Sequence, residues 1–587
     1  MKRGFLVCSL GSLVAATMAM GTPQTAEACG GTFCDGGPTP MPVDQSGENI
    51  LFVRDGDFME AHIQIQYEGE AERFGWVIPL QSLPEFSVGS EVLMQNMLSG
   101  TVPNYLVNTT PDDCSVSNEN DDFPSDGAGT SGAAEDGGQD PGGEPPPPQV
   151  VAQETVGAYE ITVLEGGTAE QVNEWLVEND YQTDPAAVEI LQAYLDEGHL
   201  FGAVKLTGGS DVDEIHPIVL RFQSDEPCIP LRLTRIAAVE DMEIRSFFLG
   251  SSRTVPRNYR HVEINQVKID WTPAGLASNY KDIISQAVDA PMAGGRAFVT
   301  EYAGTSDTVG RGNLFSESWN STVFENLELT SIIDELTSQG LFFCDLDFGN
   351  GCQPTHPLVQ PILDEFLPIP AGLDADTFYG CLSCYEDQID EMAWDGLRFS
   401  AALEERVVAP GQHALSLLDD NSYLTRMYTT ISPGEMTEDP MFHENAELAE
   451  VTNAQVATQR ILCNGDSVYV LPDGRQVYLP AGAPWPDFDG EPAWSMPSDE
   501  QVQEVMSSGA PILLTDNTAS IDSALAAYNA AQGWEGGPID EGEDTGLEAD
   551  GADSSGCGCR NTNESMGGMM LMLLGLGMGF ASRRRRD

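Results

Sequence analysis

Two acidic, glycine-rich stretches limit where this chain can form a hydrophobic core. Residues 119–149 read ENDDFPSDGAGTSGAAEDGGQDPGGEPPPPQ, and residues 535–556 read EGGPIDEGEDTGLEADGADSSG. Apolar residues are too sparse in either stretch to offset the entropy of ordering the chain, so both are predicted to be disordered acidic linkers. The folded parts must lie around them, and the second stretch would act as a flexible stalk.

These linkers and the two chain ends divide the sequence into predicted segments. The segments are a signal peptide (1–28), an N-terminal β-rich part (29–118), the acidic insert (119–149), an α+β part (150–326), a mainly helical part ending in a hairpin (327–480), a small C-terminal segment (481–534), the stalk (535–556) and a terminal tail (557–587).

The charge balance is strongly acidic. Asp and Glu number 93 against 26 for Lys and Arg, which gives a formal net charge of −67. Such a chain would repel phosphate backbones, so nucleic acid is excluded as an expected partner. Acidic side chains at this density keep an exported protein hydrated, and they also suit cations or basic partners.

The N-terminus has the three parts of a secretory signal peptide. Lys2 and Arg3 precede an apolar run over residues 5–20, and Ala26-Glu27-Ala28 is a small-x-small cleavage site. Cys29 follows that site directly, which leaves a lipoprotein as an alternative, although Glu27 departs from a lipobox pattern. The export machinery is therefore an expected partner, and the body is expected outside the cytoplasm.

The C-terminus combines two cysteines, an uncharged apolar run and a basic cluster. Cys557 and Cys559 precede residues 566–582, which as a helix would span about 25 Å, slightly less than a bilayer core. The basic cluster consists of Arg583, Arg584, Arg585 and Arg586, and these residues would stay cytoplasmic. The residues alone allow a plain inner-membrane anchor, with the body facing the periplasm.

The order of these three parts resembles the MYXO-CTERM sorting tails. The resemblance covers about the last 33 residues of the chain, from the segment SSGCGCR onward. It implies cleavage near Cys557 and Cys559 by a membrane protease of the myxosortase type. It also implies attachment at the cell surface or outer membrane, through a lipid on cysteine.

Hydrophobic periodicity predicts an α+β body with a mixed or antiparallel sheet. In residues 61–80, AHIQIQYEGEAERFGWVIPL, period-two alternation predicts two strands joined as a hairpin by the acidic EGEAER turn. Residues 159–206 predict a strand–helix–helix–strand unit. Thr168 and Gln171 match a capping box for its first helix, and Thr183 with Pro185 would begin the second.

Further elements follow along the chain. Strands are predicted at HPIVLRF (216–222), MEIRSFFL (242–249) and HVEINQVKIDW (261–271), a mostly helical segment over 327–418, and a hairpin around Asp473-Gly474 in SVYVLPDGRQVYLP (467–480). No repeat of fixed period is present in the sequence.

Several stretches of the body resemble the bacterial envelope family called domain of unknown function 2330. They are ACGGTFC, PVDQSGENILFV, AHIQIQYEGEAERFGWVIPL, CIPLRLTRIAA, AFVTEYAG and YLTRMYTTISPGEMTEDPMF, and they extend over about residues 29–445. The resemblance implies a shared fold and an envelope location. No activity is established for that family, so it supplies no catalytic residue.

The cysteines of the body predict disulfides, because export leads to an oxidising space. Setting aside Cys8 and the two tail cysteines leaves an odd number in the body, so at least one is unpaired or pairs between chains. Cys29–Cys34 and Cys344–Cys352 are the simplest local pairs. Cys381 and Cys384, in CLSC, predict a structural disulfide, with zinc ligation or redox catalysis as alternatives.

One loop offers oxygen ligands to a cation. In CDLDFGNGC, Asp345, Asp347 and Asn350 partly resemble the ligands of a calcium loop, but the terminal glutamate of an EF-hand is missing. The alternative is an Asp/Gly turn closed by the flanking cysteines. The sequence predicts no cofactor for the body, with calcium at this loop as the alternative.

Catalytic signatures are missing from the sequence. There is no H-E-x-x-H, G-x-S-x-G, P-loop or dinucleotide fingerprint, and His443-Glu444 is predicted to be a polar loop pair. The sequence therefore favours a non-enzymatic structural, adhesive or interaction protein at the cell surface, with an unknown ligand. The alternative is an extracytoplasmic enzyme, either a hydrolase or a thiol oxidoreductase using Cys381 and Cys384.

Overall fold

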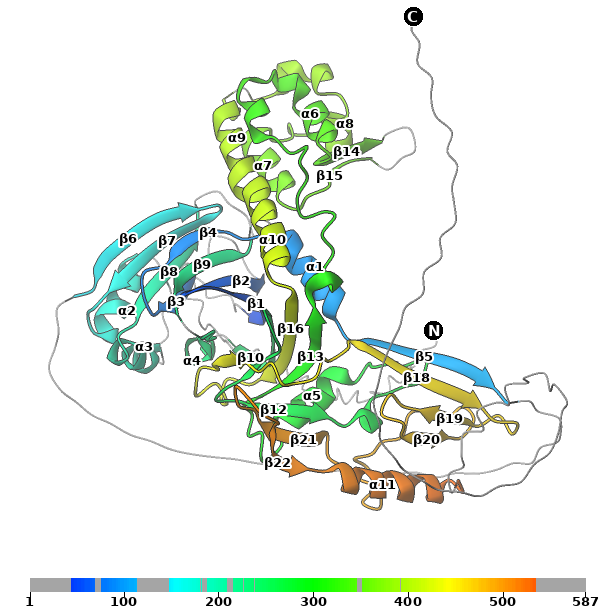
Figure 1. The fold of residues 1–587 in the computed structure, drawn as a ribbon. Helices are drawn as coiled ribbons and strands as arrows, with labels where there is room; N and C mark the ends of the chain where they lie inside the picture. Colours follow the sequence, from blue (N-terminus) through cyan, green and yellow to red (C-terminus); the bar gives the residue numbers. More distant parts are fainter. Residues whose placement is uncertain are drawn as a thin grey trace, which may run out of the picture. The chain divides into compact units, whose positions relative to one another are not determined.

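A computed structural model describes residues 44–68, 75–112, 147–179, 181, 187–207, 215–224, 226–236, 238–345, 351–390 and 392–534 (Figure 1). The chain divides into two units, Met1–Gly536 and Gly537–Asp587, and every described residue belongs to the first. The predicted signal peptide, most of the acidic insert, the stalk and the whole sorting tail lie outside the described residues. Within those ranges, no helix is long and apolar enough to cross a membrane.

A ten-stranded sheet runs through the body and confirms the predicted α+β class. Its order is β22 (Ile512–Asp516), β21 (Asp499–Glu504), β12 (Arg260–Ile264), β13 (Ala297–Thr305), β16 (Tyr423–Ile431), β10 (Ala238–Gly250), β1 (Asp44–Asp55), β2 (Phe58–Glu68), β9 (Ile218–Gln223) and β4 (Glu85–Val88). The sheet is mixed, because β1 pairs parallel to β10 and β12 parallel to β13, while the other neighbours are antiparallel.

The predicted hairpin within residues 61–80 is wrong. Both strands form, but β2 pairs with β1 and β9, whereas β3 (Gly75–Leu80) pairs with β8 in another sheet. The hairpin partner of β2 is β1, across a turn in which Gly56 has a φ of +62°. Ile63 and Ile78 lie in one core between the two sheets. Alternation therefore identified the strands but not their partners.

The predicted strand–helix–helix–strand unit is confirmed. A four-stranded antiparallel sheet has the order β3, β8 (Leu200–Leu206), β7 (Tyr159–Glu165) and β6 (Gln149–Val156). Between β7 and β8 lie α2 (Ala169–Glu178) and α3 (Ala187–Asp196). Thr168 and Gln171 form the expected capping box; the predicted start of the second helix at Thr183 and Pro185 lies outside the described residues.

Two cores enclose this smaller sheet. One face of it packs against the large sheet through side chains such as Ile161 and Val204. The other face is covered by α2 and α3, through a cluster that includes Leu164 of β7 and Phe201 of β8. On the far face of the large sheet, α1 (Glu91–Thr101) and α10 (Ala409–Asp420) pack over a third core.

The segment before β16 is mainly helical, as predicted. It contains α6 (Ile332–Ser338), the short pair β14 (Phe342–Asp345) and β15 (Gly351–Pro354), α7 (Val359–Phe366), α8 (Ala375–Tyr379) and α9 (Gly396–Leu403). A π-helical segment, Glu404–Val408, joins α9 directly to α10. One continuous helical stretch thus connects the core of this segment to the large sheet (Figure 1).

The C-terminal part adds a second four-stranded sheet, in the order β20 (Gln476–Leu479), β19 (Ser467–Val470), β18 (Ala454–Ile461) and β5 (Asn104–Pro111). The hairpin at Asp473-Gly474 is confirmed, with Gly474 at a φ of +86°. Helices α5 (Tyr280–Val288) and α11 (Thr518–Ala531) share its core. The predicted strand 261–271 stops at Ile264, because Asn265 caps a 3₁₀ turn over Gln266–Lys268.

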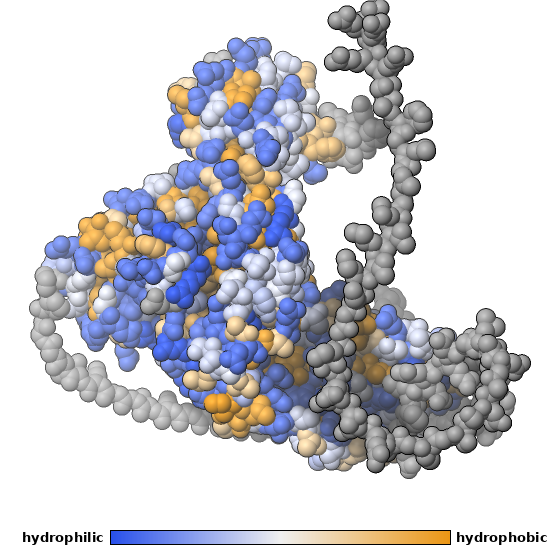
Figure 2. Space-filling view, in the orientation of Figure 1, coloured by the Kyte–Doolittle hydropathy of each residue, from blue (hydrophilic) through white to orange (hydrophobic). Residues whose placement is uncertain are grey.

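The visible surface of the described residues is largely hydrophilic. Figure 2 shows hydrophilic residues over most of the visible face and hydrophobic residues in separate patches. Scattered apolar side chains are normal on a soluble surface.

Candidate functional site

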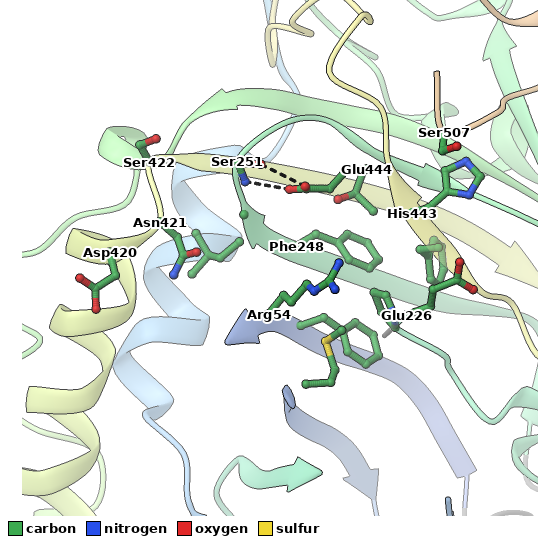
Figure 3. A pocket seen from close by; sticks show the side chains of 17 residues that line it. Arg54, Glu226, Phe248, Ser251, Asp420, Asn421, Ser422, His443, Glu444 and Ser507 are labelled. Carbon is green, nitrogen blue, oxygen red and sulfur yellow. Dashed lines mark hydrogen bonds between the residues drawn. The ribbon is translucent and has the colours of Figure 1, made fainter. Parts of the chain in front are cut away.

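A cavity of about 570 Å³ lies where β1, β10 and α10 end (Figure 3). The short strands β11 (Thr254–Pro256) and β17 (Phe442–Glu444) pair with each other at its side. Side chains at strand ends and in the following loops are less constrained by core packing, so binding residues are common at these positions. The size of the cavity suits a small ligand or one residue of a larger one.

Aromatic rings form the apolar side of the cavity. Phe52 and Phe248 stack with ring centroids 5.6 Å apart, and Phe248 contacts Phe442 at 4.8 Å. All three are nearly completely buried, because they belong to the core between the two sheets. This side of the cavity is therefore built on packed core side chains.

Glu444 dominates the polar side. Its carboxylate accepts hydrogen bonds from the Ser251 N–H at 2.7 Å and the Ser251 hydroxyl at 3.0 Å (Figure 3). It also accepts one from the Ser252 N–H at 3.2 Å. Gly250 makes this possible, since a Cβ there would lie 2.3 Å from Glu444 Oε1. The carboxylate thus fixes the turn that follows β10.

The imidazole of His443 contacts a backbone carbonyl at the side of the cavity. Pairing of β17 with β11 sets His443 opposite Val255, and its Nε2 lies 3.2 Å from the Val505 carbonyl oxygen. The Ser251 hydroxyl is already bonded to Glu444. Among the lining residues that the structure describes, no hydrogen bond joins a serine or threonine hydroxyl to this imidazole. The prediction that His443-Glu444 is a loop pair is wrong, because both residues lie in β17.

Acidic groups outnumber basic ones around the cavity. Glu226, Asp420 and Glu444 line it, against the guanidinium of Arg54. Carboxylates accept hydrogen bonds and attract positive charge. The cavity therefore suits a ligand that presents hydrogen-bond donors, such as hydroxyl or ammonium groups.

A second polar cluster forms where two of the quoted stretches meet. Asp439, from TEDPMF, accepts hydrogen bonds from the Tyr194 hydroxyl at 2.8 Å and from Arg232 Nε at 2.9 Å. Arg232, from CIPLRLT in α4 (Leu231–Thr234), also holds Glu197 with two bonds of 2.7 and 2.6 Å. Beside this cluster, the backbones of Cys228 and Met441 form an isolated antiparallel β-bridge. This network joins the two stretches to the end of α3.

Cys228 is a free thiol, but its surroundings do not favour a nucleophile. Burial, reinforced by the nearby Asp439 carboxylate, raises the pKa of the Cys228 thiol well above its usual range. The thiolate is the reactive form of cysteine. Cys228 is therefore held protonated and acts as a small packing side chain.

Two of the predicted cysteine pairs lie in the helical segment, and none of their residues lines the cavity. Cys344 and Cys352 are joined across β14 and β15, and Cys381 is joined to Cys384. A thioredoxin-like motif follows a buried strand and begins a helix, whereas Cys381 follows α8 and Cys384 ends a 3₁₀ turn. Cys463 is also disulfide-bonded.

Most of the other predicted site residues lie outside the residues that the structure describes. Asp345 ends β14, while Asp347 and Asn350 lie outside the described residues, so the calcium loop stays a prediction. Cys29, Cys34, Cys557, Cys559 and the four terminal arginines also lie outside them.

Sequence comparison assigns the chain to a protein family. A family model described as "Uncharacterized protein conserved in bacteria (DUF2330)" matches residues 23–443. The chain belongs to this family, which confirms the resemblance seen in its motifs. No curated protein and no solved structure matches the chain.

Proposed function

We propose that this chain is an exported envelope protein displayed at the cell surface, and that its body is a non-enzymatic interaction module. The signal-like N-terminus, the acidic stalk and the cysteine–apolar–arginine tail support display. The disulfides Cys344–Cys352 and Cys381–Cys384 also fit a protein that folds outside the cytoplasm.

The cavity at the ends of β1 and β10 carries the proposal of binding without catalysis. There the Ser251 hydroxyl donates to the Glu444 carboxylate, which also accepts from the Ser251 and Ser252 N–H groups. A hydrolase of the serine type needs a hydroxyl bonded to a general base. The excess of carboxylates over basic groups instead favours a ligand with hydroxyl or ammonium donors.

Blocking the cavity tests the binding proposal. Ser422 is an exposed lining residue, so Ser422→Trp should place a bulky ring at the cavity without disturbing the core. Calorimetry with neutral oligosaccharides and polyamines as probes should show binding to the wild type and at least about a tenfold loss in the variant. Ser338→Trp, at an exposed position in α6, is the matched control. Equal binding by all three proteins, or no binding of any probe, would contradict the proposal.

The mass of the mature protein tests display at the surface. Protein recovered from cell envelopes should end near Cys557 or Cys559 and carry added lipid mass, because the tail would be cleaved and replaced by a lipid. Mapping of the C-terminal peptide by mass spectrometry measures both. A chain that still carries residues 560–587 would instead support an inner-membrane anchor, with the body in the periplasm.

A further inference from the structure

Three side chains that can bind a metal converge between β2 and α10. Glu60 and His62 come from β2, and His413 comes from α10. One ligand atom of each lies within 4.8 Å of the other two. These residues are separate from the cavity at the end of β1, since none of them lines it.

The positions of these three side chains follow from strand geometry and helix packing. Residues two apart on a strand point to the same face, so Glu60 and His62 share the face of the large sheet that α10 covers. Their partners on β1 are Val53 and Leu51, which belong to the core beneath α1 and α10. His413 directly precedes Ala414, which is buried in that same core. The packing of α10 therefore holds His413 beside the strand.

Both imidazoles are directed at one carboxylate oxygen. His62 Nε2 lies 2.9 Å from Glu60 Oε1, and His413 Nε2 contacts the same oxygen. The two rings are almost parallel, with an interplanar angle of 10° and centroids 6.0 Å apart. In a tetrahedral zinc site, neighbouring ligand atoms lie about 3.3 Å apart, given metal–ligand distances of about 2.0–2.1 Å. Small side-chain movements would therefore open a metal position between the three ligands.

Burial differs across the cluster. Glu60 and His62 are 5% and 2% exposed, whereas the side chain of His413 is 45% exposed. Arg221, which pairs with Glu60 across β2 and β9, turns its guanidinium to Asp55 at 2.8 Å. Glu60 and His62 are thus held inside the protein, whereas His413 lies on the solvent side of the cluster.

We propose that Glu60, His62 and His413 form a three-ligand site for a divalent first-row transition metal, with zinc as the best fit. Two imidazoles and one carboxylate are a ligand set that zinc uses when a fourth position stays open. That position would face the exposed side of His413 and accept water or a donor atom of a ligand. The metal would also fasten α10 to β2. This proposal is independent of the binding proposed for the cavity.

Cobalt substitution tests the site directly. The full mature protein, stripped with a chelator and titrated with Co²⁺, should take up about one ion per chain with the visible bands of four- or five-coordinate cobalt. A thiolate-to-cobalt charge-transfer band should be missing, because no cysteine belongs to the cluster. Excess Zn²⁺ should remove the spectrum by displacement, and Zn²⁺ alone should raise the melting temperature.

Two variants separate this site from adventitious histidine binding. His413→Gln should lose the spectrum and the thermal shift and weaken Co²⁺ binding by at least about tenfold, while circular dichroism confirms folding, since His413 is largely exposed. His199→Gln replaces a histidine outside the cluster and should behave as the wild type. Unchanged cobalt binding in His413→Gln, a thiolate band in the wild type, or no cobalt binding at all would overturn the proposal.

Discussion

Buried charged side chains in the large sheet fall into two kinds. Arg426 Nε donates to Glu301 Oε2 at 2.5 Å, and both side chains are almost inaccessible. Arg426 also donates to the Leu98 carbonyl at 3.1 Å, which connects β16 to the end of α1. Glu48 is the other kind: it is 3% exposed, and its Oε2 has no hydrogen-bond partner among the described residues. A buried pair can offset its desolvation, whereas a lone carboxylate protonates instead.

Glu48 should make stability depend on pH. Burial raises the pKa of Glu48 from 4.5 to about 7. Since the folded state binds this proton more tightly than the unfolded state, the stabilisation is present below pH 4.5 and is lost as pH rises through 7. In the wild type, this group should lower the unfolding free energy by on the order of 3 kcal/mol between pH 4.5 and 8. Glu48→Gln should not show this decline. Urea denaturation followed by tryptophan fluorescence measures it, because Trp76, Trp271 and Trp485 are buried in the folded state.

The control for this prediction is an exposed carboxylate. Glu165→Gln, at the exposed end of β7, should leave the pH dependence of the wild type unchanged. A pH profile of Glu48→Gln that is parallel to the wild type would show that Glu48 does not carry the effect.

At the scale of elements, the pair β14 and β15 depends on more than its own hydrogen bonds. Each strand has four residues, and Cys344 pairs directly with Cys352 across them. Two short strands are marginal by themselves in water. The disulfide joins them at this register, and Cys352 lies in the core of the helical segment with Ile362 and Phe366 of α7.

Removing this cross-link should loosen the helical segment selectively. Cys344→Ala together with Cys352→Ala should lower the free energy of opening of α7 by about 2–3 kcal/mol, the loop-closure entropy of a short disulfide loop. Hydrogen exchange of the α7 amides measures this local opening. Cys228→Ala removes a cysteine without removing a cross-link and should leave α7 unchanged. Equal protection of α7 in all three proteins would contradict the prediction.

At the scale of the whole molecule, stretches that are distant in sequence meet in single structural units. β1 and β10 are parallel neighbours, and AFVTEYAG and YLTRMYTT pair as β13 and β16. Tyr194 reaches Asp439 across 245 residues. The small C-terminal segment adds β21 and β22 to the edge of the large sheet. The family motifs therefore specify the centre of one shared sheet.

Local patterns in the sequence were sufficient where a few neighbouring residues decide the conformation. The capping box of α2 and the turn at Gly474 depend on contacts within a short stretch, and β7 and β8 are recognisable from their own residues. The period-two pattern around His62 also predicted that β2 is a strand. In each case the deciding interaction spans one turn or one strand.

Only the tertiary structure decided which faces meet. Alternation shows that one side of a strand is buried, but any strand of matching pattern could pair with it, so β2 and β3 were predicted to pair although they lie in different sheets. Glu60 and His413 are 353 residues apart, and no local spacing marks them as partners. Both the cavity and the cluster of Glu60, His62 and His413 arise from such contacts, because side-chain packing over the whole sheet selects the pairs.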